Sequence, residues 1–136
     1  MNHVYTVTFI IQYENTKDNF LIGFFSSYKK AKEIRKYYSE NVIGFKDNPE
    51  GYYEIEKIKI NAKKIETDKK FYYVNGWNEN EYGDEIDIVI SDLFEDPNEA
   101  KIFLKHYPKE FKRQYWIITG CNIDKCYWEE GFLPYN

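Results

Sequence analysis

The sequence predicts an α+β fold of two repeated strand-strand-helix-strand units, each with an antiparallel sheet and one helix, related by an approximate two-fold axis. Two observations support this prediction. Residues 23–32 align without a gap on residues 92–101, and the match extends to Tyr38 on Tyr107. Residues 4–13, ahead of the first helix, alternate in polarity as a half-buried strand does, and at the same repeat spacing Tyr13 falls on Tyr82.

The first unit is expected over residues 1–60. Residues 4–13 alternate between apolar and polar side chains, which predicts a half-buried strand. A polar loop then leads into a second strand over 20–25, and a third strand follows the helix over 52–60. The apolar face of the first strand comprises Tyr5, Val7, Phe9, Ile11 and Tyr13, and its polar face comprises Thr6, Thr8 and Gln12.

The second unit is expected over residues 71–136, with a connector over 61–70 and a C-terminal tail. A hairpin would pair residues 71–77 with residues 85–91, and a last strand would follow the second helix over 115–123. A unit of about 60 residues is marginally stable alone. The two units are therefore expected to bury each other in one compact domain.

Both helices begin at a residue that suits an N-cap. Ser27 and Asp96 occupy the aligned position, where their side-chain oxygens can accept hydrogen bonds from free backbone amides. Pro97 and Glu99 follow Asp96 at the first and third helical positions, as in a capping box. Apolar residues at helical spacing predict that one face of each helix packs on a sheet. They are Ala31, Ile34 and Tyr38 in the first helix and Ala100, Phe103, Leu104 and Tyr107 in the second.

Residues 23–27 read Gly-Phe-Phe-Ser-Ser, and residues 44–51 read Gly-Phe-Lys-Asp-Asn-Pro-Glu-Gly. With Val4, Tyr5 and Ala31, these segments resemble a small bacterial and phage domain family of unknown function. The second half keeps the helix entry but has Pro-Lys-Glu-Phe at 108–111 in place of the glycine-rich turn. The resemblance implies no activity and no functional residue.

Composition favours a folded protein in the cytoplasm. The 136 residues are 43% hydrophobic, enough to bury a core. No stretch approaches the roughly 20 apolar residues of a membrane span. The start of the chain, residues 1–4, lacks the basic and apolar regions of a signal peptide.

The sequence contains none of the usual catalytic signatures. It has no nucleophile elbow, no phosphate-binding glycine loop and no dinucleotide fingerprint. Cys121 and Cys126 could supply two zinc ligands, but the site would need both distant histidines, so free thiols are the expected state. We therefore expect a non-enzymatic protein with no catalytic residue, no metal and no cofactor.

Charge is distributed unevenly between the halves. Residues 1–69 hold 12 Lys or Arg and 10 Asp or Glu, whereas residues 70–136 hold 7 and 13. Nine acids and no base fall within residues 78–100, which favours a basic protein partner over nucleic acid. The simpler alternative is a solvated hairpin whose charges prevent strand-to-strand aggregation. The partner-binding residues expected are Trp77, Glu79, Glu81, Tyr82, Asp84 and Glu85.

Three functions remain open. The leading hypothesis is a protein-binding module, such as an immunity or anti-defence inhibitor that neutralises a basic nucleic-acid-handling enzyme. The rival is a small-ligand sensor or enzyme that uses a cleft between the two units. The third is a homodimer assembled through an exposed strand edge, and no membrane partner is expected. The cleft residues expected for the rival are Tyr5, Tyr52, Tyr115 and Trp116.

Overall fold

The computed structural model describes residues 2–13 and 16–132 of the chain. It confirms the α+β class, and the predicted strands and helices occur in the predicted order. One short additional strand, over residues 93–94, precedes the second helix. The end of the expected tail, residues 133–136, lies outside the described residues. The strands are β1 (His3–Tyr13), β2 (Thr16–Phe25), β3 (Tyr52–Asn61), β4 (Lys70–Glu79), β5 (Glu85–Ile90), β6 (Leu93–Phe94) and β7 (Tyr115–Asn122), and the helices are α1 (Tyr28–Asn41) and α2 (Pro97–Glu110).

The expected N-caps are confirmed. The Ser27 side chain accepts a hydrogen bond from the backbone amide of Lys30, and the Asp96 side chain accepts one from the amide of Asn98. Pro97 occupies the start of α2. In each helix, the face that carries the regularly spaced apolar residues is the buried one. It includes an alanine one turn after the N-cap, Ala31 in α1 and Ala100 in α2. Neither helix has the length and apolar composition needed to cross a bilayer, as judged over residues 2–13 and 16–132.

The sheet is mixed, which corrects the expectation of an antiparallel sheet. Its strands follow the order β2-β1-β3-β6-β4-β5, with β7 also paired to β4, and β3 pairs with β6 in parallel. Ser91 lies at the point where β5 ends and the chain leads into β6. Its hydroxyl accepts from the Val74 amide and donates to the Asp92 carbonyl, both at 2.8 Å. These bonds end β5 and turn the chain toward the end of β3.

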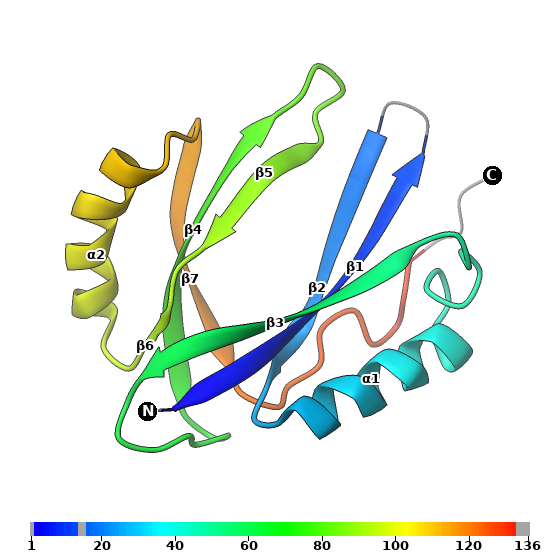
Figure 1. Ribbon diagram of the computed structural model, residues 1–136, viewed down its shortest axis with the longest axis horizontal. Coiled ribbons are helices and arrows are strands. Elements are labelled where there is room, and N and C mark those ends of the chain that lie inside the picture. Colours follow the sequence, from blue (N-terminus) through cyan, green and yellow to red (C-terminus); the bar gives the residue numbers. More distant parts are fainter. Residues whose placement is uncertain (1, 14–15, 133–136) are drawn as a thin grey trace.

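The sheet curls until the chain after β7 meets β2 (Figure 1). Ile123 bridges Phe24, and the amides of Asp124 and Tyr127 donate to the carbonyls of Phe24 and Ile22, both at 2.7 Å. We call this the closed end of the sheet. Apolar side chains from both halves fill it, so each half covers the core of the other. They are Val4, Phe24, Ile60, Phe71, Tyr73, Leu93, Cys121 and Ile123.

The helices lie on the outer faces of the curled sheet, and the hairpins β1–β2 and β4–β5 project together at the opposite end (Figure 1). We call this the open end. The chain after β7 runs back along the first half, where the ring of Phe132 stacks on that of Phe20 at 4.3 Å. Trp128 contacts the same Phe20 ring edge-on at 4.9 Å. Residues 126–132 thus complete the aromatic core beneath α1.

Candidate functional site

The loop between β4 and β5 has a defined backbone. Asn80 Oδ1 accepts hydrogen bonds from the amides of Tyr82 and Asp84, both at 2.9 Å. Gly83 has φ of +86°, a left-handed conformation that suits glycine. Hydrogen bonds within the loop thus hold its backbone.

The acids expected to bind a partner have two different environments. Glu79, Glu81 and Glu85 are exposed, and the Tyr82 side chain at the loop tip is 53% exposed. Asp84 instead lies half-buried between the two hairpins. Its carboxylate accepts from the Lys17 amide at 3.0 Å and from the Asn80 side chain at 3.2 Å. Asp84 therefore joins the hairpins, and the other three acids face solvent.

A second hairpin adds negative charge to the open end. Asp18 of β2 lies near Asp84, and burial raises the pKa of Asp18, with the Asp84 charge raising it further. Two carboxylates held close together repel each other. The two hairpins thus bring two carboxylates close together at the open end.

An aromatic pair lies on the inner face of the sheet beside these acids. The rings of Trp77 and Tyr115, which are paired across β4 and β7, stack at 5.5 Å with an interplanar angle of 26°. Ile117 lies on the same face of β7, and Tyr115 and Ile117 are each 46% exposed. Glu79 follows Trp77 by two residues and so continues this face. The structure thus unites Trp77 and Tyr115, which sequence reasoning assigned to different sites.

A cleft of about 420 Å³ separates the two halves at the open end. Strands β1, β2 and β3 form one wall, and β4 and β5 form the other. Its lining is a mixture of hydroxyl, amide, carboxylate and aliphatic groups. The polar residues that sequence reasoning did not place in a cleft include Thr6, Thr8, Asn19, Glu54, Glu56 and Asn75.

The four aromatic residues expected to line the cleft lie elsewhere. Tyr5 packs in the core beneath α1, with its ring 5.8 Å from that of Tyr28, and Trp116 packs beneath α2. Tyr52 is 45% exposed, and Tyr115 lies in the aromatic pair. The reason is that most large aromatic residues of the strands face the helices. The residues between them, many of which are polar, therefore face the cleft. Polar residues at every second position of a strand were the sequence pattern that could have identified the residues lining the cleft.

Asn75 has an unusual environment in the cleft wall. Its Oδ1 atom is shielded from solvent and has no hydrogen-bond partner among the described residues. A buried acceptor without a donor costs about 1–3 kcal/mol. The residue lies between Tyr73 and Trp77 on the inner face of β4, where an aliphatic side chain would avoid this cost.

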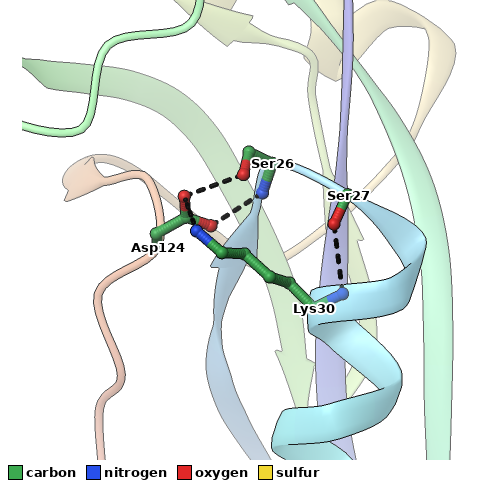
Figure 2. A network of polar contacts seen from close by, with 4 residues as sticks. All are labelled: Ser26, Ser27, Lys30 and Asp124. Atoms are coloured by element: carbon green, nitrogen blue, oxygen red, sulfur yellow. Dashed lines mark hydrogen bonds and ion pairs between the residues drawn. The ribbon is translucent and has the colours of Figure 1, made fainter.

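Asp124 ties the closed end together (Figure 2). Its carboxylate accepts from the backbone amide and hydroxyl of Ser26, both at 2.8 Å, and from Lys30 Nζ at 2.9 Å. Burial would raise the pKa of Asp124, but these hydrogen bonds and the Lys30 charge outweigh it and lower the pKa. The network fastens the chain after β7 to the start of α1, so it belongs to the fold rather than to a binding site.

Nucleophilic and metal chemistry receive no support from the described residues. Burial raises the pKa of the Cys121 thiol to about 12, which keeps it protonated and unreactive. Within residues 2–13 and 16–132, no three His, Cys, Asp or Glu side chains gather as metal ligands.

No family model, curated protein or solved structure matches this chain. The resemblance of the first half to a small bacterial and phage domain family thus stays a prediction.

Proposed function

We propose that this protein is a non-enzymatic protein-binding module whose open end recognises a basic protein surface. The stack of half-buried Trp77 on exposed Tyr115 beside the hairpin acids is the observation that carries this proposal. Tight interfaces commonly combine aromatic anchors with charges complementary to the partner. Ile117 extends the apolar area, while Glu79, Glu81 and Glu85 supply the surrounding negative charge.

The partner expected on electrostatic grounds is a basic nucleic-acid-handling enzyme. A surface that presents carboxylates repels phosphates and attracts the lysines and arginines that such an enzyme uses to hold nucleic acid. Covering those residues would inhibit the enzyme. This is the mode of action of an immunity or anti-defence inhibitor, and it would operate in the cytoplasm.

We also infer that the two halves are diverged copies of one strand-strand-helix-strand unit. In both, the first strand lies in the middle: β1 lies between β2 and β3, and β4 lies between β5 and β7. Both helices are capped at the aligned residue, Ser27 or Asp96. Divergence would then explain why the aromatic pair and the acidic hairpin occur in the second half alone.

Affinity capture followed by binding kinetics tests the proposed function. The native chain serves as bait beside Glu79→Gln/Glu81→Gln and beside Tyr115→Ala, and the retained basic protein is identified by mass spectrometry and purified. We expect the charge variant to lower the association rate constant about tenfold at low ionic strength. Tyr115→Ala should raise the dissociation rate constant by about tenfold or more, as loss of an aromatic anchor does.

Glu33→Gln/Glu40→Gln is the matched control, because these exposed acids lie on α1, away from the open end. It removes the same charge and should leave both rate constants unchanged. Equal effects from the two charge variants would mean that only net charge matters. Capture of the same proteins by native chain and Tyr115→Ala, with equal affinity, would reject the proposed surface.

A further inference from the structure

We propose that the cleft between the two halves binds an aliphatic diamine or polyamine, a function separate from that of the protein-binding surface. The cleft volume of about 420 Å³ lies within the range of roughly 300–1,000 Å³ typical of small-molecule sites. Its lining combines a few polar groups with aliphatic side chains, which is also typical of such sites.

The charge of the cleft selects a cation with more than one charged group. Four of its lining residues are acids, two from each half of the molecule, and Lys17 is the one base among the described lining residues. Glu54 and Glu56 lie on β3, and Glu85 and Asp87 lie on β5, where the Asp87 carboxylate also accepts a hydrogen bond from the Asn78 side chain at 3.1 Å. Carboxylates from both halves favour a ligand that carries an ammonium group at each end.

The middle of the ligand is expected to be an alkyl chain. Aliphatic residues from both walls line the cleft together with the acids: Ile10, Leu21, Ile86, Ile88 and Ile90. Ile88 is 37% exposed in the empty cleft. Covering such side chains with methylene groups is favourable by about 25 cal/mol per Å² of apolar surface removed from water. A metal ion would gain nothing from this part of the cleft.

Asn75 supplies the hydrogen-bond acceptor that an ammonium group requires. Its Oδ1 lacks a donor among the described residues. A rotation of the amide about the Cβ–Cγ bond would turn this oxygen into the cleft, where an N–H of the ligand pairs with it. Binding thus pairs this oxygen with an N–H of the ligand, a hydrogen bond that a neutral alkane could not make.

Titration calorimetry with spermidine and with cadaverine tests this proposal on the full chain. Pentane-1,5-diol and glutarate are the ligand controls, because they keep the chain length but remove or reverse the charge. We expect heat from both amines and none from either control. Asn75→Leu and, separately, Glu54→Gln/Glu56→Gln should each weaken amine binding about tenfold or more, and the glutamine variant should also reduce its salt dependence.

Glu79→Gln/Glu81→Gln is the matched protein control, since these acids are not among the lining residues of the cleft. It should bind amines like the native chain while associating more slowly with the protein partner, which separates this proposal from the proposed function. A circular dichroism spectrum confirms folding of each variant. The exposed Glu54 and Glu56 positions provide a readout if the Asn75 variant is unfolded.

An NMR titration adds a local measurement. The side-chain amide signals that disappear in Asn75→Leu should shift when cadaverine is added to the native chain. Equal binding of pentane-1,5-diol, or amine binding unaffected by the Asn75 and Glu54/Glu56 variants, would overturn the proposal. So would binding confined to a lysine-rich peptide, because the cation would then be a partner's side chain rather than a free amine.

Discussion

The two ends of the curled sheet use the same strands for different purposes. At the closed end, the inner residues Val4 of β1 and Phe71 of β4 are fully buried in an apolar core. Four residues further along the same strands, Thr8 and Asn75 line the cleft. The change from apolar to polar inner residues along each strand therefore decides where the core ends and a binding site begins.

The bonds that hold the ends together also differ. Strand-like backbone bonds and the Asp124 network fasten the closed end. At the open end, the hairpins are joined by the Asp84 carboxylate and by the Asn19 side chain, which donates to the Glu85 carbonyl at 3.4 Å. Few buried apolar contacts at an element's end favour local opening. We expect the open end to separate more readily, as entry of a ligand requires.

The largest expected effect comes from the closed end. Phe71 is fully buried, and Phe71→Ala should lower the free energy of unfolding by about 3–5 kcal/mol because it leaves a cavity in a packed core. Thr8→Ala, on the inner face at the open end, should change it by about 0.5 kcal/mol or less. Urea denaturation of both variants measures the difference. Similar losses from the two variants would mean that the ends are equally packed.

An intermediate effect is expected at Asp124. Asp124→Asn retains the size of the side chain and the tolerance of its left-handed backbone, φ of +63°, but removes the charge that Lys30 and Ser26 stabilise. We expect a loss of about 1–2 kcal/mol near neutral pH, by urea denaturation. Lys30→Met, which removes only the exposed half of the ion pair, should cost less.

The same network sets a pH dependence. The pKa of Asp124 is lowered in the folded protein, so its contribution is present above the unfolded value, about 3.9, and is lost as the pH falls through the lower folded value. The difference in stability between the native chain and Asp124→Asn should therefore disappear in acid. A difference that persists unchanged to about pH 2 would show that the carboxylate charge is not what stabilises this turn.

Most strands and both helices could be predicted from the sequence because local patterns, such as alternating polarity and N-cap residues, specify them. Alternating polarity located β1, and Ser27 and Asp96 located the helix starts. The two-residue strand β6 was missed, because such a short segment has no periodicity. Its parallel pairing with β3 depends on a tertiary contact between residues more than 30 positions apart, which no local pattern reveals.

The candidate site was less accessible to sequence reasoning. The hairpin acids were identified from composition, but the partner of each side chain depends on the fold: Asp84 turned out to join two hairpins. For the cleft, Thr6 and Thr8 were recognised as the polar face of β1. A polar face of a strand can contact either solvent or the polar face of the other half of the sheet. Which of the two it contacts depends on how the two halves pack together.

The smallest expected effect is at Asp18, on the open end. Burial and the nearby Asp84 raise its pKa in the folded protein, so the stability contributed by its bound proton is present in acid and lost as the pH rises through the folded value. Asp18→Asn should thus stabilise the protein near neutral pH, by a few tenths of a kcal/mol because the site is partly solvated. The gain should vanish below about pH 3, where both forms are uncharged.

Urea denaturation of native chain, Asp18→Asn, Asp84→Asn and the double variant measures the coupling between these two acids. Asp84→Asn alone loses the charge but also weakens its bond with the Lys17 amide, so its own effect has two parts. The double variant separates them: removing Asp18 should stabilise less when Asp84 is already neutral. Destabilisation by Asp18→Asn near neutral pH would show that its carboxylate is favourably bound. The carboxylates of the open end would then be stabilised by the protein itself, as Asp124 is at the closed end. That result would argue against a cationic partner at the open end.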